Sequence, residues 1–422
     1  MSEPASPMVE AAELSYRDAL DFLFPRTTAI KFGLERTERL LAALGNPHHV
    51  VPVVHVGGTN GKGSVTALVV AALAEAGWRV GTYTSPHLVD FRERITVGGV
   101  PISEAAVAMW TARLRPLIEA EGATFFEAAT AIAFADLAAR GAEIAVIEVG
   151  LGGRLDSTNV VRPLASGVTK IAMDHQKYLG DTLERIAAEK AWIAKPGAPF
   201  VIGEEDPAVI AVLASEAARA VQSIDAGVHP DLRVVPAGVA WDGPLGLAGP
   251  HQRRNAAVAA ALLAALPVPY RPSSEATAAG FAAAFVPGRL DRRGKWLFDV
   301  AHNPDGVRAL VRALQDQAPA GPVHALVSIL GDKEWPAMLV ELDRVVDQGV
   351  LTVAPSADTR KWDLEWLRQW LERSDRPLAR ARWRLIEDFP AALAEVQDGA
   401  GTVLVTGSFH TVGDVMAALG FA

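Results

Sequence analysis

The sequence contains no cysteine, and this absence excludes disulfide bonds, thiolate metal sites and thiol nucleophiles. It also lacks an excess of basic residues, since 40 Lys and Arg stand against 49 Asp and Glu and the net charge is −9. No nucleic-acid partner is therefore expected, because binding a phosphate backbone requires a clustered basic surface. The longest apolar run, residues 256–268, is too short to span a bilayer, and residues 1–13 lack the features of a signal peptide. These absences predict a cytoplasmic protein without a membrane partner.

The chain does contain a regular alternation of strand-like and helical segments. Its 422 residues exceed the size at which a single core usually keeps growing, so two domains are expected. The alternation favours an α/β fold in which a mostly parallel sheet carries helices on both faces. In the first part, strands are expected at Val51–Val56, Arg79–Tyr83, Ile144–Val149, Gly167–Ala172, Phe200–Ile202, Leu232–Val235 and Trp241–Leu247. Helices are expected at 62–76, Glu104–Ala120, Glu127–Ala139 and Gln252–Leu266.

A second series of strands begins near Trp296, and each strand precedes a helical segment, which indicates a further βα unit of about domain size. These strands are expected at Trp296–Val300, Val323–Ile329, Val350–Val353, Trp383–Ile386 and Thr402–Thr406. The Pro-Gly pair within Pro287–Leu290 breaks the preceding helix. We therefore expect one domain over residues 1–288 and a second over residues 289–422.

A glycine-rich segment follows the first strand and opens a helix: His55-Val56-Gly57-Gly58-Thr59-Asn60-Gly61-Lys62-Gly63-Ser64. Glycines let the backbone aim its N–H groups at phosphate oxygens, while the helix N-terminus and Lys62 supply positive potential. The spacing departs from G-x-x-x-x-G-K-[ST], because Val56 takes the first glycine position and Gly63 separates Lys62 from Ser64. A turn that binds nothing is the alternative, but a lysine between two glycines has little packing value. The segment predicts a nucleotide phosphate site that uses Asn60, Gly61, Lys62, Gly63 and Ser64.

The form G-T-N-G-K-G-S resembles the phosphate loop of the Mur ligase superfamily. Further segments, in family order, make the chain similar to folylpolyglutamate synthase and its bifunctional form, dihydrofolate synthase/folylpolyglutamate synthase. They are Gly33-Leu34-Glu35-Arg36, Thr84-Ser85-Pro86-His87-Leu88, residues 148–156, Asp174-His175, Glu189-Lys190-Ala191, His251-Gln252 with Asn255, Pro287-Gly288-Arg289, Ala301-His302-Asn303-Pro304 and Asp332-Lys333. Departures occur at Trp192 and Val300, where the family usually has glycine, and at Gln176-Lys177-Tyr178, where an acidic pattern is commoner.

The resemblance implies a three-layer N-terminal ATPase domain with a phosphate loop and a smaller, Rossmann-like C-terminal domain. The active site would lie between them. It implies a ligase that joins L-glutamate to dihydropteroate, to folyl-(poly)glutamate or to both, through an acyl phosphate formed from ATP. A monomer with only small-molecule partners is expected.

A magnesium site is the next implication. By the resemblance, Ser85 and Glu148 hold one Mg²⁺, and Glu148, His175 and a carbamylated Lys190 serve a second. Magnesium takes hard oxygen ligands, and a carboxylate at the end of a buried strand is costly unless it is paired or liganded. Each residue also has an ordinary interpretation: Glu148 as the partner of Arg154, Ser85 as a turn cap, His175 as a hydrogen-bonded loop residue, and Lys190 as a solvated lysine.

The resemblance assigns further contacts with ATP and glutamate. Asn255 would contact the adenine, and Arg289 and Asp299 would bind ATP from the domain junction and the second domain. His302 would lie beside the reacting phosphate, with capping of the following helix as the alternative. With Lys62, Glu148, His175 and Lys190, it completes the expected catalytic set. Asp332 and Lys333 would frame the glutamate site, although Lys333 could equally be a surface charge.

For the pterin, the family indicates three segments. They are Ile30-Lys31-Phe32, Thr124-Phe125-Phe126-Glu127 and Leu155-Asp156-Ser157. An aromatic floor with a carboxylate suits a flat heterocycle that carries amide-like donors. Phe125 and Phe126 could equally be core residues.

Three other classes share some of these features. A Mur ligase of peptidoglycan synthesis would normally carry a further N-terminal domain, and only about fifty residues precede Val51. A phosphate-loop switch or motor would leave His175, Lys190 and Asn255 unexplained. A non-catalytic nucleotide-binding module would not need two metal sites.

Overall fold

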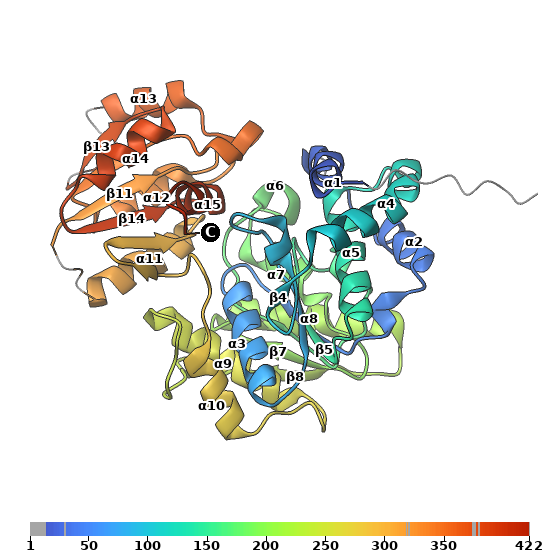
Figure 1. Ribbon diagram of the computed structural model, residues 1–422. Coiled ribbons are helices and arrows are strands. Elements are labelled where there is room, and N and C mark those ends of the chain that lie inside the picture. Colours follow the sequence, from blue (N-terminus) through green and yellow to red (C-terminus); the bar gives the residue numbers. More distant parts are fainter. Residues whose placement is uncertain are drawn as a thin grey trace, which may run out of the picture.

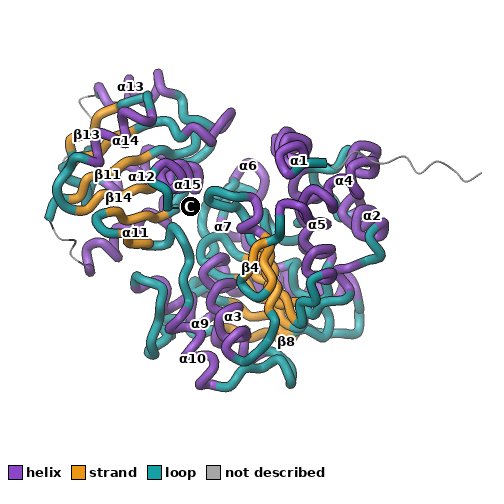
Figure 2. Tube along the Cα trace, viewed as in Figure 1, coloured by secondary structure: helices purple, strands orange, loops and turns teal. Residues whose placement is uncertain are grey.

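Two separate β-sheets organise the chain, one in each half of the sequence. The computed structural model describes residues 14–28, 31–317, 319, 321–373, 377–378 and 380–421. Figure 1 shows two lobes, one built from the blue to yellow elements up to α10 and the other from the orange and red elements from α11 onward. In each lobe a sheet lies among helices, as the strands and helices of Figure 2 show. The expected two-domain α/β architecture is therefore confirmed.

The first sheet has eight strands among the described residues. From edge to edge they are β4 (Val100–Pro101), β3 (Ile95–Val97), β2 (Val80–Tyr83), β5 (Ile144–Glu148), β1 (Val53–Gly57), β6 (Ala165–Val168), β7 (Pro199–Ile202) and β8 (Asp231–Val234). All neighbours from β2 to β8 pair in parallel, whereas β3 and β4 are antiparallel additions at one edge. Strand β1 thus lies between β5 and β6, in the middle of the sheet.

Side chains of the first sheet alternate between two buried layers, as the two-residue period of a strand requires. Val53 and Ile147 belong to one core cluster, and Val54 and Val146 belong to another on the opposite face. The helices α1 (Tyr16–Leu23), α2 (Glu35–Ala43), α4 (Glu104–Glu121) and α5 (Phe125–Ala139) cover the first layer. The helices α3 (Lys62–Glu75), α9 (Pro250–Ala265) and α10 (Ser274–Ala283) cover the second. A further cluster packs α7 (Leu183–Ala191) and α8 (Pro207–Ile224) beside β6 and β7. The short α6 (Gln176–Leu179) precedes α7.

The second sheet has six strands in the described part of the chain. In order they are β13 (Arg382–Leu385), β12 (Gln348–Leu351), β11 (Val323–Val327), β14 (Thr402–Thr406), β10 (Trp296–Asp299) and the antiparallel β9 (Asp291–Arg293). The helices α11 (Pro304–Gln317), α12 (Trp335–Leu342) and α13 (Leu364–Glu372) pack on one face. The helices α14 (Phe389–Gln397) and α15 (Phe409–Ala418) pack on the other. These elements form a second three-layer unit, as the expected fold class requires; the boundary between residues 288 and 289 stays a prediction.

One expected strand is wrong. Trp241–Leu247 forms no strand, because Pro244 cannot donate to a ladder and because other contacts hold the segment. The N–H of Trp241 donates to the carbonyl of Arg253 on α9, and the Trp241 ring packs edge-to-face on Phe281 of α10 at 4.9 Å. The segment therefore fastens two helices to each other.

Strand β6 also ends earlier than expected, at Val168 rather than Ala172. The carbonyl of Lys170 accepts hydrogen bonds from the N–H groups of Thr59 and Asn60, so the chain leaves the sheet to meet the phosphate loop. No helix of the described residues combines the length and the apolar character needed to cross a membrane.

Candidate active site

The phosphate loop joins β1 to α3 in the middle of the first sheet. Gly58 has a φ of +134°, and a Cβ there would lie 1.9 Å from the Thr169 hydroxyl oxygen, so only glycine passes this point. Gly61, in the left-handed region, is the N-cap of α3 and brings no side chain to the first turn. The N–H groups that begin α3 therefore have no side-chain cap, which is the arrangement that binds phosphate.

Hydrogen bonds to the segment after β6 hold the phosphate loop in place. The carbonyl of Lys170 accepts from Thr59 N and Asn60 N at 2.8 and 3.2 Å, and the Thr169 hydroxyl donates to the Asn60 carbonyl at 2.8 Å. Lys62 folds back over the loop, with Nζ donating to the Thr59 carbonyl at 3.2 Å. The predicted phosphate-binding residues thus lie in this turn, which holds Asn60 and Gly61, and in the first residues of α3, which are Lys62, Gly63 and the buried Ser64.

Glu148 ends β5, directly beside β1, and points at the start of α3. Its register partner is Val56, and one of its carboxylate oxygens lies 3.7 Å from the position that a Cβ on Gly63 would take. The side chain is buried. Burial raises the pKa of Glu148, while the positive charges of Lys62 and Arg289 act in the opposite direction. The carboxylate therefore faces the phosphate loop and lies in the positive field of Lys62 and Arg289.

The ordinary interpretation of Glu148 as the partner of Arg154 is wrong. Arg154 pairs with Glu189 at 2.6 Å, and among the described residues no Lys, Arg or His nitrogen lies within ion-pair distance of Glu148. A backbone hydrogen bond from Ser85 opposes the effect of burial on the pKa of Glu148. Ser85 lies in the loop after β2 and thus reaches the same carboxylate that the sequence assigns to the metal.

Lys190 is buried rather than solvated. Only 4% of the residue is exposed, and Nζ donates to the carbonyl of Gly58 in the phosphate loop at 2.9 Å. Burial, followed by the charge of Lys62, lowers the pKa of Lys190 from 10.5 to about 7. A Cβ on Gly153 would lie 2.9 Å from the Lys190 carbonyl, so the loop after β5 packs against the backbone of this lysine.

His175 follows Asp174 in the loop after β6 and adopts a left-handed conformation with a φ of 51°. Burial and the nearby Lys333 lower the pKa of His175 to about 3. The ring is therefore neutral at pH 7 and can offer a lone pair.

The donor set can be compared with what magnesium requires. Among the described residues, no three His, Asp or Glu side chains gather closely enough to hold a metal ion by themselves. Glu148 is a buried carboxylate with no cationic partner at ion-pair distance within the described ranges, His175 is neutral, and Lys190 is a buried amine with a lowered pKa. Glu148 and His175 can thus offer an oxygen and a nitrogen to a cation, and the remaining oxygens that magnesium requires would have to come from other groups.

The predicted ATP contacts gather around the domain junction. Asn255 lies on α9, with its side-chain oxygen 2.5 Å from the position of a Cβ on Gly61, so its amide covers the phosphate loop. Asp299 ends β10 and accepts from the N–H groups of Leu290 and Ala301 at 3.0 and 2.9 Å. Burial raises the pKa of Asp299, and the charge of Arg289 opposes this effect.

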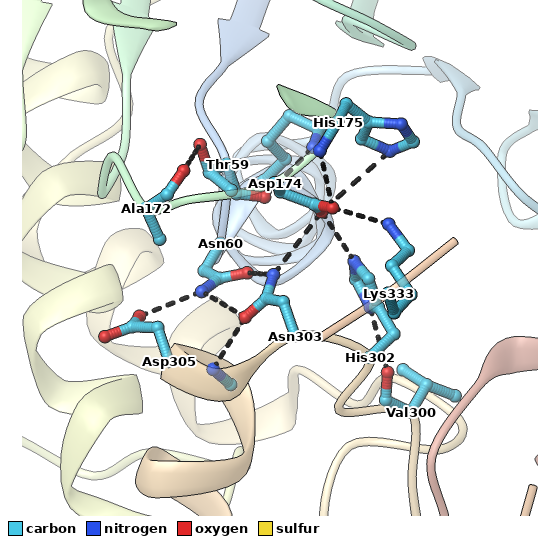
Figure 3. Close-up of polar contacts among 12 residues, drawn as sticks. Thr59, Asn60, Ala172, Asp174, His175, Val300, His302, Asn303, Asp305 and Lys333 are labelled. Carbon is cyan, nitrogen blue, oxygen red and sulfur yellow. Dashed lines mark hydrogen bonds and ion pairs between the residues drawn. The ribbon is translucent and has the colours of Figure 1, made fainter. Parts of the chain in front are cut away.

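Three side chains of the second domain meet at Asp174 of the first (Figure 3). Its carboxylate accepts from Nε2 of His302 at 3.3 Å and from the amide of Asn303 at 3.4 Å, and it pairs with Nζ of Lys333. The N–H of His175 also donates to it at 2.9 Å. Burial alone would raise the pKa of Asp174, but the hydrogen bond from His302 and the charge of Lys333 lower it. Lys333 is buried, so its interpretation as a surface charge is wrong.

A second contact joins the domains through the phosphate loop itself (Figure 3). The side-chain amides of Asn60 and Asn303 pair reciprocally at 2.9 and 3.2 Å, and Asn60 also donates to Asp305 at 2.9 Å. Asn303 accepts from Gly306 N at 2.8 Å, so Asn303 rather than His302 caps α11. Sequence reasoning assigned no role to Asp174, Asn303 or Asp305. Asp174 and Asn303 lie in loops that follow strands, which was a usable signal, whereas Asp305 lies in the first turn of α11.

The predicted aromatic floor is part of the core. Phe125 is buried and stacks on Phe24 with ring centroids 5.5 Å apart, and Arg94 lies over its ring. Phe126 stacks on Tyr83 at 6.1 Å and is half-buried. Both rings occupy the first turn of α5. Core packing thus accounts for Phe125, while part of Phe126 stays accessible.

The other members of this segment serve the helix. Thr124 and Glu127 form a reciprocal capping box at the start of α5, and Glu127 pairs with Arg36 at 2.8 Å. Lys31 donates to the carbonyl of Gly122 at 2.7 Å. Half of Phe32 is exposed. Ile30 lies outside the described residues.

Asp156 has its oxygens engaged within its own loop. It caps the short 3₁₀ helix η4 (Ser157–Val160), and it accepts from the N–H groups of Leu151 and Thr158 at 2.8 and 3.0 Å and from the Thr158 hydroxyl. Ser157 is buried, whereas Leu155 is 37% exposed. A pterin contact by Leu155, Asp156 and Ser157 stays a prediction.

Comparisons with known proteins agree with this geometry. Residues 56–263 match the Mur ligase middle domain, and residues 288–409 match the glutamate ligase domain of Mur ligases. A Bacillus subtilis protein named dihydrofolate synthase/folylpolyglutamate synthase is 34% identical over 95% of this chain and 98% of its own length. A longer relative from Haloferax volcanii, a probable bifunctional folylpolyglutamate synthase/dihydropteroate synthase, is 35% identical over 95% of this chain, which spans 50% of that protein.

Solved structures resemble the whole chain. A structure of FolC from Escherichia coli in complex with DHPP and ADP has a TM-score of 0.81 and 31% identity, and the match covers 99% of both chains. A bifunctional folylpolyglutamate synthase/dihydrofolate synthase from Yersinia pestis, complexed with AMPPNP and a Mn ion, has a TM-score of 0.80 and 31% identity over 99% of this chain and 100% of the other.

The paired three-layer domains, with a phosphate loop facing the second domain, define a ligase of the Mur type, which forms carbon–nitrogen amide bonds. Within that class, identity over nearly the full length of both chains places this protein more narrowly. The chain belongs to the dihydrofolate synthase/folylpolyglutamate synthase family.

Proposed function

We propose that this chain joins L-glutamate to dihydropteroate and to folyl-(poly)glutamates, using ATP and releasing ADP and phosphate. The observation that carries the proposal is the meeting of two sets of groups at Asp174. The phosphate loop, Glu148 and Lys190 lie on one domain, and His302 and Lys333 reach the same place from the other. A phosphate loop that faces a second domain carrying the cation Lys333 suits the transfer of an activated acyl group to an amine.

The chemistry requires an activated carboxylate, because oxide is a poor leaving group. A carboxylate oxygen of the folate substrate attacks the γ-phosphorus of ATP, and the bond to ADP breaks. The glutamate amine then attacks the acyl carbon and loses a proton, and phosphate leaves with the electrons of the carbon–oxygen bond. The protein contributes mainly position and charge. Lys62 and the start of α3 would hold the phosphates, His302 would lie beside the transferred group, and Asp332 and Lys333 would frame glutamate.

Divalent metal would be held where Glu148 faces the phosphate loop. The proposed ligands are Ser85 and Glu148 for one Mg²⁺, and Glu148, His175 and Lys190 for a second. Bound magnesium would neutralise phosphate oxygens during transfer. The support is the buried Glu148 carboxylate, which has no cationic partner at ion-pair distance in the part of the chain that the structure describes, and the neutral imidazole of His175.

Lys190 would act as a carbamate. An ammonium group at this position would repel a metal, whereas addition of carbon dioxide to the neutral amine gives an anion with two oxygens. The lowered pKa of about 7 favours that reaction, because only the neutral amine adds carbon dioxide. The nearby Lys62 would then face an anion instead of a cation.

The remaining assignments follow the resemblance. Asn255, Arg289 and Asp299 would bind ATP around the domain junction. The pterin would lie near Phe126 and the loop of Leu155, Asp156 and Ser157, which packs on Lys190. Residues 1–288 and 289–422 would be the two functional units. A monomer in the cytoplasm stays a prediction of the sequence.

The test is ADP release by the purified protein with MgATP. Turnover should require both glutamate and a pterin substrate, and mass spectrometry should show one added glutamyl group on dihydropteroate and on a reduced folate. ATP hydrolysis that is independent of glutamate would instead indicate a switch or motor. Extension of the folate without any product from dihydropteroate would restrict the activity to polyglutamylation.

A further inference from the structure

Asp174 receives three side chains from the second domain. His302 and Asn303 come from the loop between β10 and α11, and Lys333 comes from the loop between β11 and α12. Figure 3 shows all three directed at this one carboxylate. Only 7% of Asp174 is exposed, so this is a buried meeting point rather than a contact at the rim.

Asp174 is the only carboxylate of the described residues within ion-pair distance of Lys333. The Lys333 side chain is 6% exposed. Without the negative charge of Asp174, this ammonium group would be buried without a counter-ion. No ion pair would then hold the Lys333 side chain between the two domains. The position of Lys333 therefore depends on a residue of the other domain.

The segment that carries Asp174 is fixed to the phosphate loop. The hydroxyl of Thr59 donates to the carbonyl of Ala172 at 3.3 Å, and the carbonyl of Lys170 accepts from two N–H groups of the loop. Asn303, which contacts Asp174, also pairs with Asn60 of the loop. Asp174 thus links the phosphate loop to the two loops of the second domain that carry His302 and Lys333.

We propose that Asp174 is a positioning residue, which places Lys333 and His302 against the phosphate loop so that glutamate is held in line with the activated carboxylate. The inference rests on the proposed function, since it assigns to Lys333 the glutamate side of the reaction. Asp174 acts through Lys333 and His302 and need not touch a substrate.

The test compares Asp174→Asn with wild type. This substitution keeps a side-chain oxygen that can accept a hydrogen bond but removes the negative charge. The KM for glutamate should rise roughly tenfold, the scale of a lost charge-assisted hydrogen bond, while the KM for ATP stays within about threefold. The matched control is Lys170→Ala, which removes an exposed ion pair across the same domain boundary, to Asp305 at 3.6 Å. The control should leave both constants within about threefold, as is usual for exposed pairs.

A second variant separates position from stability. In Asp174→Asn with Lys333→Gln, both charges of this buried pair are removed, so thermal stability should return toward wild type while the KM for glutamate stays high. Recovery of stability and of the glutamate KM together would show a purely structural role and overturn the inference. So would an equal rise in both KM values of the single variant.

A measurement that does not depend on turnover distinguishes failure of the positioning role from failure of the proposed function. Hydrogen exchange of residues 330–335 should increase in Asp174→Asn and not in Lys170→Ala. Absence of that difference overturns the positioning role even if the ligase is active. If the wild-type protein makes no glutamyl product but the two variants still differ in hydrogen exchange, the proposed function is refuted. The positioning of Lys333 by Asp174 is then retained.

Discussion

Replacing Lys190 with methionine should abolish ligase turnover and, in buffer free of carbon dioxide, raise the stability of the fold. Methionine retains the length and apolar packing of the lysine stem but carries no amine. Without the amine no carbamate forms, so the expected anionic ligand is lost. The buried positive charge is lost as well, and its removal acts in the opposite direction on stability.

The size of the stability effect follows from the pKa of Lys190. Burial lowers this pKa from 10.5 to about 7, a difference of about 3.5 pH units that corresponds to about 5 kcal/mol. Below pH 7 the lysine is protonated in both the folded and the unfolded state, and the folded state bears the full cost. Between pH 7 and 10.5 the unfolded state binds more protons, so stability rises with pH, and above 10.5 the cost is gone. Lys190→Met should therefore gain up to about 4 kcal/mol at pH 7 and little at pH 10.5.

The assay is denaturant unfolding at pH 7 and pH 10, with EDTA present, alongside ADP release under turnover conditions. Bicarbonate should stabilise the wild type, because it converts a buried cation near Lys62 into an anion, and should not stabilise Lys190→Met. In Lys190→Ala, formate or acetate should restore part of the turnover by filling the space that the carbamate leaves.

Lys195 provides the matched control. Burial lowers the pKa of Lys195 to about 8, so Lys195→Met should also gain stability at pH 7 while turnover is retained. The carbamate is refuted if Lys190→Met keeps activity within about tenfold of wild type, the scale of a lost metal-site group. It is also refuted if bicarbonate has the same effect on the stability of Lys190→Met as on that of wild type.

Three further substitutions test other parts of the site. Glu148→Gln should leave the fold intact and abolish ADP release, because the metal loses its shared anionic ligand; turnover within about tenfold of wild type would contradict this. Lys62→Ala should raise the KM for ATP and lower kcat without changing folate binding by calorimetry, and unchanged ATP kinetics would make the loop structural. Asp156→Ala should reduce glutamylation of dihydropteroate more than extension of a reduced folate in parallel steady-state assays. Equal losses would assign Asp156 to scaffolding of its loop.

The sequence was most informative where a local pattern determines local structure. The strand–glycine–helix pattern predicted the start of α3 at Lys62, because glycine conformation and helix initiation depend on adjacent residues. It failed at Trp241–Leu247, whose apolar residues pack between α9 and α10 instead of entering a sheet. Whether an apolar run joins a ladder or fastens two helices depends on distant partners.

The candidate site likewise contains residues that the local sequence predicted and contacts that depend on distant parts of the chain. The sequence located the phosphate loop and Glu148, but the burial of Lys190 depends on the loop at Gly153 and on the carbonyl of Gly58, which are far away in the chain. The contacts of Asp174 with Lys333 span 159 positions and could not be read from spacing. Phe125 stacks on a core ring, and Glu127 forms a capping box with Thr124 and an ion pair with Arg36, contacts that the sequence did not indicate; pterin binding by either residue stays a prediction.

The topology explains why motifs so widely spaced fall into one place. In the first sheet β1 lies between β5 and β6, so the phosphate loop, the loop after Glu148 and the loop of Asp174 open side by side at the carboxyl ends of these strands. In the second sheet β14 lies between β11 and β10, which brings the loops of His302 and Lys333 to one edge. Ligands of open α/β sheets bind at such reversals of strand order. The contacts at Asp174 show that the two edges face each other, so under the proposed function an intermediate formed on one edge would lie directly before the groups of the other.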